Sequence, residues 1–265
     1  MAVHDLWIRD VLTIYGSLIF GTVFIYYIVK LKWSKFTNYI YRSHLLGFET
    51  ECAELMVSYK KRLLEPLNNI ISKDPVLKAK NCIRLLEIGV KTGQNIPFYP
   101  DETHFIGVDC NHKLEEYLTR NGPLWQFAHI FIEKIIVGDG TQLKQIPTGY
   151  VDAVVTIRSL CSISPVADTL QEIKRILVLD GQYFFLEHIP HRKGTLTRWL
   201  QELLTKTKIW PTLFGDCRLD SNPLKEIKTT GFRKVKWDTF KLQGDVTQSY
   251  RLNLTCYHMM GIAKK

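Results

Sequence analysis

The chain has 265 residues, a length that supports one domain with a sizeable core and an additional segment. Hydrophobic residues make up 46% and charged residues 23%, which excludes a disordered or collagen-like chain. The net charge of +9 predicts an anionic partner or location, either nucleic acid or the face of an anionic membrane. The six cysteines are scattered without a CxxC pair, so we expect reduced, mostly buried thiols rather than disulfides or a zinc site.

An uncharged apolar run over residues 11–29 predicts a membrane helix near the start of the chain. At about 1.5 Å per residue, this run just crosses the hydrocarbon layer of a bilayer. Basic residues follow it at positions 30, 32, 35 and 42. The positive-inside rule therefore places the rest of the chain in the cytosol.

We accordingly predict a membrane anchor over residues 1–37, through which the chain contacts membrane lipid. A cleaved signal peptide is the less favoured alternative, because no small-residue cleavage site closes the run. A helix lying in the interface, or a hairpin dipping into one leaflet as on a lipid droplet, stays open as a third interpretation.

Residues 38–80 predict an amphipathic helical linker, because charged and apolar residues alternate there at helical spacing with a break at Pro66. Its basic residues Lys60, Lys61 and Arg62 indicate a solvated face, with contact to lipid headgroups as the alternative.

From residue 81 to 265 the pattern predicts an α/β domain. Short apolar runs predict strands over 82–89, 103–109, 131–139, 150–157 and 181–189, and helical spacing recurs over 112–120 and 166–177. This alternation predicts a mostly parallel, doubly wound, Rossmann-like sheet. Two further extended segments, 232–240 and 251–265, predict a closing antiparallel hairpin.

Acidic residues stand at the ends of the first three predicted strands, at Glu87, Asp109 and Asp139. Ligands of an open parallel sheet bind at these carboxyl ends. A nicotinamide dinucleotide would require GxGxxG, whereas Gly89 and Gly93 form GxxxG, and a carboxylate there would repel a pyrophosphate. A cofactor with an ammonium group, a ribose diol and an adenine but no phosphate fits better, which predicts S-adenosylmethionine.

Each acid has a predicted role in that site. Glu87 is expected to face the cationic methionyl end directly or through water, Asp109 the ribose hydroxyls, and Asp139 the adenine amino group. The alternatives are a buried lysine partner for Glu87, a helix cap near Asn111 for Asp109, and a simple turn for Asp139. The complete predicted cofactor site comprises Glu87, Gly89, Lys91, Gly93, Asp109, Asn111, Asp139 and Gly140.

Five segments in order, LLEIGVKTG, FIGVDCN, VGDGTQL, YVDAVVTIRSLCSI and ILVLDGQYFFLEHI, resemble the seven-stranded class I methyltransferases. More narrowly, the anchor, FYP, LCS, EH and LFGDC resemble the membrane-anchored microsomal thiol S-methyltransferases of endoplasmic reticulum and lipid droplets. The resemblance implies methyl transfer from S-adenosylmethionine to a small lipophilic thiol, with the catalytic domain facing the cytosol. A lipid O- or C-methyltransferase, or a catalytically impaired surface protein of membranes or droplets, remains the alternative.

Lys91 departs from that family, which usually has a glycine at this position. A left-handed backbone at a lysine costs about 1–2 kcal/mol. Its side chain has three alternatives: solvent, occlusion of the pocket, or contact with the carboxylate of the cofactor's methionyl group.

Predicted acceptor residues follow the fourth and fifth strands. His188 is the candidate that raises the thiolate fraction of an acceptor, with a local structural role as its alternative. Arg158, Cys161 and Trp199 are predicted to line the acceptor pocket. The alternatives are a buried small residue for Cys161 and ordinary packing for the segment around Trp199. We expect no metal, because His191 stands in HIPH on a proline-containing loop, and no nucleic acid, because the basic residues are dispersed.

Overall fold

The chain divides into two compact units, Met1–Gly47 and Phe48–Lys265. The computed structural model describes residues 3–40, 52, 54–112, 114, 127–242 and 253–265. Apart from residues 112 and 114, the predicted helix over 112–120 lies outside these described residues.

The first unit contains one long helix, α1 (Val3–Ile40). Its segment Thr13–Trp33 has 21 residues with a mean hydropathy of 1.6, so it is long and apolar enough to cross a membrane. The hydroxyl of Thr22 donates to the carbonyl oxygen of Leu18 at 2.7 Å, which satisfies this polar group within the helix. The predicted helical apolar run is confirmed.

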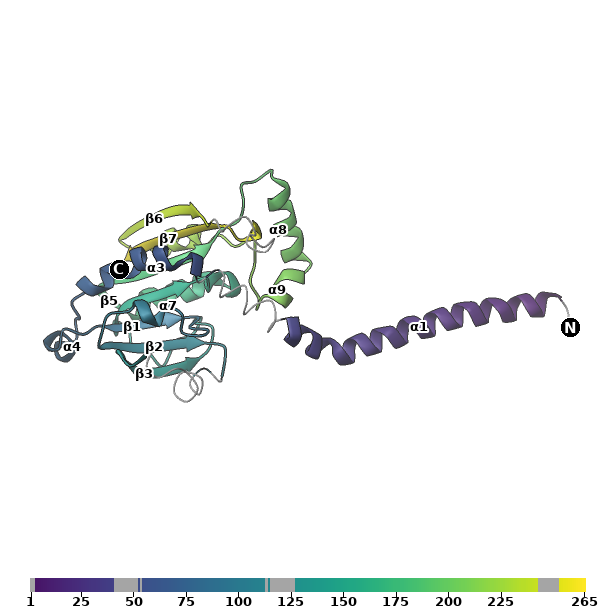
Figure 1. The fold of residues 1–265 in the computed structure, drawn as a ribbon, viewed down its shortest axis with the longest axis horizontal. Coiled ribbons are helices and arrows are strands. Elements are labelled where there is room, and N and C mark those ends of the chain that lie inside the picture. Colours follow the sequence, from purple (N-terminus) through teal and green to yellow (C-terminus); the bar gives the residue numbers. More distant parts are fainter. Residues whose placement is uncertain (1–2, 41–51, 53, 113, 115–126, 243–252) are drawn as a thin grey trace. The chain divides into compact units, whose positions relative to one another are not determined.

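The second unit is built on a seven-stranded sheet with the order β3-β2-β1-β4-β5-β7-β6 (Figure 1). The strands are β1 (Arg84–Ile88), β2 (Thr103–Asp109), β3 (Ile130–Val137), β4 (Val151–Ile157), β5 (Leu177–His188), β6 (Lys234–Lys241) and β7 (Tyr257–Lys264). The first five strands are parallel, and β7 pairs antiparallel with both β5 and β6. The predicted sheet and its closing hairpin are confirmed.

Strand β5 begins four residues before the predicted start at 181. Its register against β4 shifts between the pairs Val151–Leu177 and Ala153–Gln182. Asp180 absorbs this irregularity with a φ of +67°. The Asp180-Gly181 pair therefore signals a bulge within the strand rather than the turn that its composition predicts.

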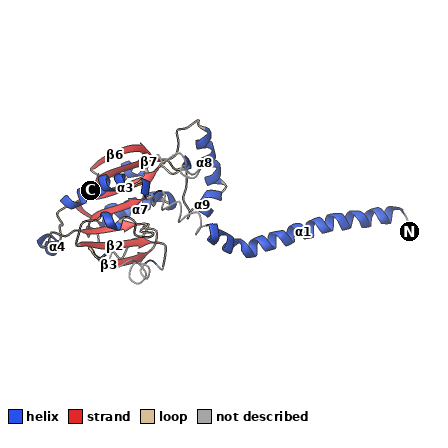
Figure 2. Ribbon diagram, viewed as in Figure 1, coloured by secondary structure: helices blue, strands red, loops and turns tan. Residues whose placement is uncertain are grey.

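The helices of the second unit pack around this sheet (Figure 2). Helix α3 packs against β5 and β7, α7 against β5, and α10 against α7. Every residue of β1 and β4 is buried, as expected for central parallel strands. The helical elements are α3 (Val57–Leu64), η2 (Glu65–Asn69), α4 (Pro75–Ala79), η3 (Ile96–Phe98), η5 (Leu160–Ser162), α7 (Val166–Ile176), α8 (Leu196–Lys206), α9 (Ile209–Leu213) and α10 (Leu224–Thr229).

Buried Asp152 ties the predicted linker to the sheet. Its carboxylate accepts from the Ser72 hydroxyl at 2.7 Å, from the Lys73 amide at 3.1 Å and from the Arg84 amide at 2.9 Å. These three bonds join the segment before α4 to β1 and β4. The helices α3, η2 and α4 therefore lie within the same compact unit as the sheet.

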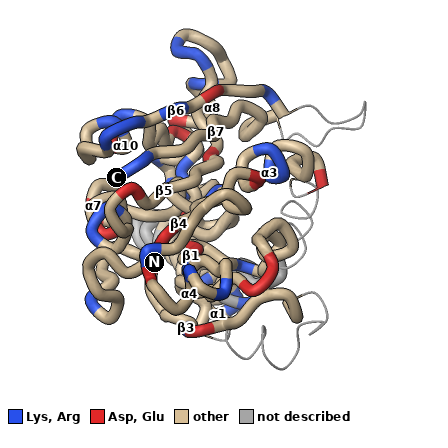
Figure 3. The backbone as a smooth tube through the Cα atoms, turned by 90° about the vertical axis from the view of Figure 1, so that its left-hand side faces the viewer, with Lys and Arg blue, Asp and Glu red and all other residues tan. Residues whose placement is uncertain are grey.

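Charged residues are distributed over several elements of this unit. Figure 3 shows Lys and Arg on α3, α7 and α10, with Asp and Glu interspersed among them. The expected solvated face is confirmed for Lys61 and Arg62, which are exposed. It is wrong for Lys60, which is only 3% exposed, because the opposite face of α3 packs on the sheet.

Candidate active site at the carboxyl ends of the strands

The carboxyl ends of the five parallel strands meet at one edge of the sheet. In spatial order from β3 to β5, they place Asp139, Asp109, Glu87, Arg158 and His188 along that edge. The strand order reverses between β1 and β4, so the loops that follow these two strands flank the crevice where ligands of this architecture bind.

A pocket lies at this reversal of strand order. The loop after β1 forms one wall and the end of β4 another, while α3 contributes Lys60 and its N-cap residue, Met56. Its lining residues are Met56, Lys60, Val90, Lys91, Thr92, Gln94, Asn95, Ile157 and Arg158.

Glu87 is fully buried behind this pocket. Its two carboxylate oxygens accept from the Asn95 amide at 2.6 Å and from the Tyr99 hydroxyl at 2.7 Å. Burial raises the pKa of Glu87 to about 7, although both hydrogen bonds and the charge of Lys60 oppose this shift. Asn95, held by Glu87, is the residue of this group that reaches the pocket wall beside Lys60.

The loop after β1 uses left-handed backbone at Gly89, Lys91 and Gly93, with φ values of +80°, +54° and +74°. A Cβ on Gly89 would overlap the Ser159 hydroxyl, so only glycine lets the loops after β1 and β4 approach this closely. Lys91 therefore has the left-handed backbone that costs a lysine about 1–2 kcal/mol. Its ammonium group lies 3.3 Å from the carbonyl oxygen of Arg158, across the pocket rim.

Asp109 links two loops through its carboxylate. One oxygen accepts from the Lys91 amide at 2.8 Å, and the other accepts from the Asn111 amide at 2.8 Å. Its side chain is half-buried, so it fixes the loop after β1 while remaining at the surface of the crevice.

Asp139 forms a local turn, in which its carboxylate accepts from the amide of Thr141 at 2.9 Å and from its hydroxyl at 2.6 Å. Burial raises the pKa of Asp139, but the bonds from Thr141 outweigh it and hold this pKa below its ordinary value. The next residue, Gly140, has a φ of +84°, and a Cβ there would lie 2.9 Å from Ile88. Asp139 therefore forms the turn that was its alternative role, while the predicted contact to the adenine stays a prediction. Its carboxylate is ionised at neutral pH.

The turn after β4 contains Arg158, a buried charged residue whose φ is +53°. Its guanidinium lies 3.3 Å from Nε2 of His258 and 3.4 Å from the sulfur of Cys52. Burial, together with the charges of Arg158 and His188, holds the pKa of His258 well below its usual range. His258 therefore accepts from Arg158 as a neutral imidazole, with Nδ1 on the Cys256 carbonyl at 3.1 Å.

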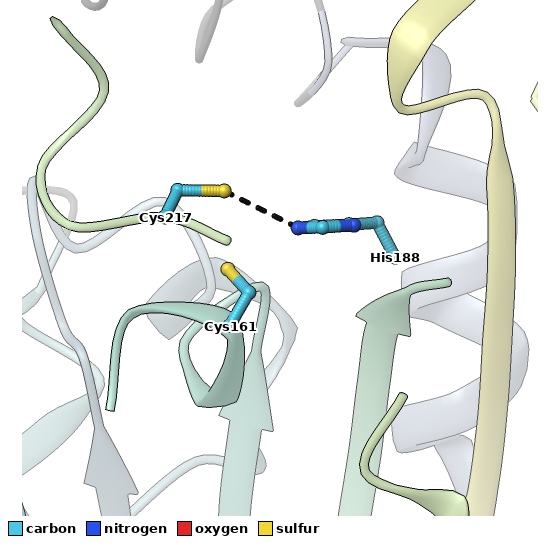
Figure 4. A group of neighbouring side chains, drawn as sticks. All are labelled: Cys161, His188 and Cys217. Carbon is cyan, nitrogen blue, oxygen red and sulfur yellow. Dashed lines mark hydrogen bonds between the residues drawn. The ribbon is translucent and has the colours of Figure 1, made fainter. Parts of the chain in front are cut away.

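Three buried side chains converge next to this turn: Cys161 on η5, His188 at the end of β5, and Cys217 after α9 (Figure 4). Their sulfur and nitrogen atoms all lie within 4.8 Å of one another. Nε2 of His188 lies 3.2 Å from the Cys217 sulfur. The amide of Arg218 donates to the Cys161 carbonyl at 2.9 Å, which fixes the loop that carries Cys217 against η5.

The two thiols of this cluster differ in acidity. Their mutual hydrogen bond raises the pKa of Cys161 well above its ordinary value and lowers that of Cys217. Burial opposes the lowering, whereas the charges of Arg158 and Lys91 add to it. Cys217 is therefore the member of the pair that carries negative charge more readily.

Two further residues lie apart from this cluster: Trp199, which was predicted to line the acceptor pocket, and His191 of HIPH, for which no metal was expected. Trp199 is 58% exposed on α8 and does not line the described pocket. Nε2 of His191 lies 3.0 Å from the Asn253 carbonyl, so the two histidines of HIPH do not converge.

Sequence reasoning missed four residues that the structure places at or behind the site, namely Lys60, Asn95, Tyr99 and Cys217. Two short motifs, FYP and LFGDC, already contained a signal for Tyr99 and Cys217. The sequence contains no such signal for Lys60, because a helical pattern does not reveal which basic residue of a helix faces inward.

Comparison with solved structures identifies the fold. A possible histamine N-methyltransferase from Thermotoga maritima superimposes with a TM-score of 0.52 at 15% identity, covering 86% of this chain and 99% of that one. A geranyl diphosphate methyltransferase in complex with S-adenosylmethionine gives 0.52 at 13% identity, covering 77% and 84%. Residues 86–185 match the family described as a methyltransferase domain. The fold and the site together define a class I S-adenosylmethionine-dependent methyltransferase.

Among curated proteins, the rat thiol S-methyltransferase TMT1B is 32% identical over 180 residues, which is 68% of this chain and 72% of that protein. The human thiol S-methyltransferase TMT1A is 28% identical over 204 residues, or 77% and 80% of the two chains. The chain belongs to the methyltransferase family that contains TMT1A and TMT1B.

The pocket fits S-adenosylmethionine, the cofactor of this family. It lies at the reversal of strand order, its loop has the backbone conformation that close approach requires, and the basic residues Lys60, Lys91 and Arg158 line it. The carboxylates follow β2 and β3, whereas Lys60 and Lys91 lie at the pocket itself. This separation matches a ligand with a diol and an amine at one end and a carboxylate at the other.

Proposed function

We propose that this chain methylates small lipophilic thiols at the cytosolic face of the endoplasmic reticulum membrane or of lipid droplets, anchored there through α1. The named activity of its relatives supports this acceptor class, and so does the apolar span Thr13–Trp33. The proposal keeps an anchor over 1–37, a linker over 38–80 and a catalytic domain over 81–265, with α3 of the linker contributing Lys60 to the pocket.

The observation that carries the thiol proposal is the chemistry beside the pocket. Arg158 lies on the pocket wall, and Cys161 and His188 follow the neighbouring strand ends. Positive charge and a ring nitrogen favour the thiolate form of an acceptor whose ordinary pKa is about 8.5. We assign His188 the role of increasing that thiolate fraction.

The other predicted site residues would each contact a different part of S-adenosylmethionine. Asp109 would hold the ribose diol, with Asn111 beside it, and Asp139 with Gly140 the adenine. Lys91, between Gly89 and Gly93, would pair with the methionyl carboxylate, and Glu87 would hold Asn95 against the same end. S-adenosylmethionine supplies a methyl group already activated on a sulfonium. The chain therefore has mainly to align the acceptor and exclude water.

A thiol panel tests the proposed function. We expect the full-length protein in detergent to release S-adenosylhomocysteine with lipophilic alkyl and aryl thiols. The matched alcohols should give no product, because an alcohol is not ionised at neutral pH. Turnover with lipid alcohols alone would favour an O-methyltransferase. Cofactor binding without turnover on any acceptor would favour the impaired surface protein.

Two substitutions of Lys91 separate its charge from its backbone strain. Lys91→Met keeps the strained backbone and the apolar stem but removes the ammonium group, so we expect about fivefold weaker S-adenosylmethionine binding by calorimetry. Lys91→Gly removes strain and charge together. If the glycine variant binds more tightly than the wild type, Lys91 obstructs the pocket and the proposed ion pair is wrong.

A further inference from the structure

The Cys161, His188 and Cys217 cluster offers a set of donors that the proposed reaction does not use fully. All three side chains are buried, with exposures of 4%, 0% and 7%. They come from three separate elements, and Figure 4 shows their donor atoms turned toward one another. Packing alone explains a buried cysteine or histidine, but it gives no reason for two thiols and an imidazole to face a common point.

The spacing of these donors suits a tetrahedral metal ion. Zinc bonds of about 2.3 Å to sulfur and 2.0–2.1 Å to nitrogen place two ligand atoms about 3.5–3.8 Å apart. Here the Cys217 sulfur and His188 Nε2 are separated by 3.2 Å, and all three donor atoms lie within 4.8 Å. Small side-chain rotations therefore bring the triangle to zinc geometry.

We propose that Cys161, His188 and Cys217 bind Zn²⁺, and that the open fourth position receives the acceptor thiol. Two thiolates and one imidazole form a set known from catalytic zinc sites, which keep one position for water or substrate. This assignment contradicts our expectation from sequence, which considered only ligands at short spacing. It deepens the proposed function and rests on it for the identity of the fourth ligand.

The surroundings favour an anionic fourth ligand. Two thiolates cancel the charge of Zn²⁺, so a bound acceptor thiolate leaves the site with a net negative charge. Arg158, three residues before Cys161, and Lys91 on the pocket wall supply the compensating positive charge. The same Arg158 carbonyl lies 3.3 Å from the Lys91 ammonium and 3.8 Å from the Cys161 sulfur, which places the cluster beside the cofactor pocket.

The reaction then balances without a free base. The acceptor thiol loses its proton to solvent as its sulfur coordinates zinc. That sulfur forms a bond to the methyl carbon while the bond from this carbon to the sulfonium breaks. The products are a neutral thioether, which is a weak zinc ligand, and S-adenosylhomocysteine. His188 acts in this scheme as a metal ligand, so it increases the thiolate fraction of the acceptor through the ion that it holds and not by accepting the proton itself.

Zinc content is the first test. We expect full-length protein purified from zinc-supplemented medium and dialysed to carry about one zinc per chain by mass spectrometry of the metal. Cys161→Ser and Cys217→Ser should reduce the zinc content by more than about tenfold. Cys82→Ser is the matched control, since Cys82 is buried at the opposite end of the sheet, before β1. Equal zinc loss in the control, or metal-free wild type with a Cys161–Cys217 disulfide, overturns the proposal.

Cobalt replacement tests the fourth position without depending on activity. Co²⁺ in the wild-type protein should give thiolate charge-transfer bands, and an alkyl thiol added without cofactor should shift the visible bands, whereas its S-methyl ether should not. A thiol response without S-adenosylhomocysteine release would leave the zinc site intact and refute the proposed methyl transfer. Full thiol methylation by zinc-free protein would refute the role of zinc in binding the acceptor thiol and leave the proposed function standing.

Discussion

Asp109→Ala is expected to weaken S-adenosylmethionine binding by about 100-fold, measured by calorimetry on the full-length protein. The carboxylate accepts from the Lys91 and Asn111 amides at 2.8 Å each, so its removal releases both loops at once. Hydrogen bonds to a charged group contribute about 1.5–3 kcal/mol each, and 2.7 kcal/mol corresponds to about 100-fold in affinity. The proposed contact to the ribose diol is lost in the same change.

Asp101→Ala provides the control for this substitution. Asp101 is an exposed acid two residues before β2, so its removal alters the net charge equally without touching the crevice. We expect its affinity for the cofactor to stay within about twofold of the wild type, as for other surface substitutions. An unchanged affinity in Asp109→Ala, with the far-ultraviolet circular dichroism of the wild type, would remove Asp109 from the cofactor site.

Glu87→Gln is expected to remove a pH dependence of stability that the wild type shows between about pH 4.5 and 7. The folded pKa of Glu87 is about 7 against an ordinary value of 4.5, because burial disfavours its charge. A raised folded pKa means that the folded state holds more protons than the unfolded state in this window, so stability falls as pH rises. Above about pH 8 the cost of the buried charge levels off, on the order of 3 kcal/mol.

Urea unfolding at pH 5 and at pH 8 measures this effect. The wild type should lose on the order of 2–3 kcal/mol of unfolding free energy between the two values, beyond the change shared with Glu87→Gln. Glutamine preserves the contacts, since its oxygen can accept from Asn95 while its amide donates to the Tyr99 hydroxyl. Parallel pH dependences in both proteins would show that Glu87 is ionised in the folded state throughout.

The order of elements and the acids of the crevice could be predicted because both leave a local signal. Apolar runs of strand length that end in Glu87 and Asp109 predict buried strands with polar ends. The start of β5 could not be predicted, since Asp180 has the composition of a turn but occupies a bulge. Composition reports local backbone preference, whereas the register between β4 and β5 is set by the whole sheet.

The cluster of Cys161, His188 and Cys217 could be predicted only in part, because its residues converge from distant segments. Cys161 and His188 follow strand ends, which marks them for inspection, but Cys217 lies in a loop after α9. Nothing in its neighbourhood along the chain indicates that the Arg218 amide would reach the carbonyl of Cys161. The exposure of Trp199 likewise depends on which face of α8 packs inward, and buried Gln201 shows that a polar residue occupies that face.

The position of β7 between β5 and β6 has a consequence for how the chain is made. During synthesis, β5 is complete at His188, but the strand that covers its edge begins only at Tyr257. The ribosome adds these roughly 70 residues at about 5–20 per second, so the edge of β5 waits several seconds for its partner. The strand that ends in His188 is therefore the last of the parallel strands to become internal, and the acceptor side of the crevice matures after the cofactor side.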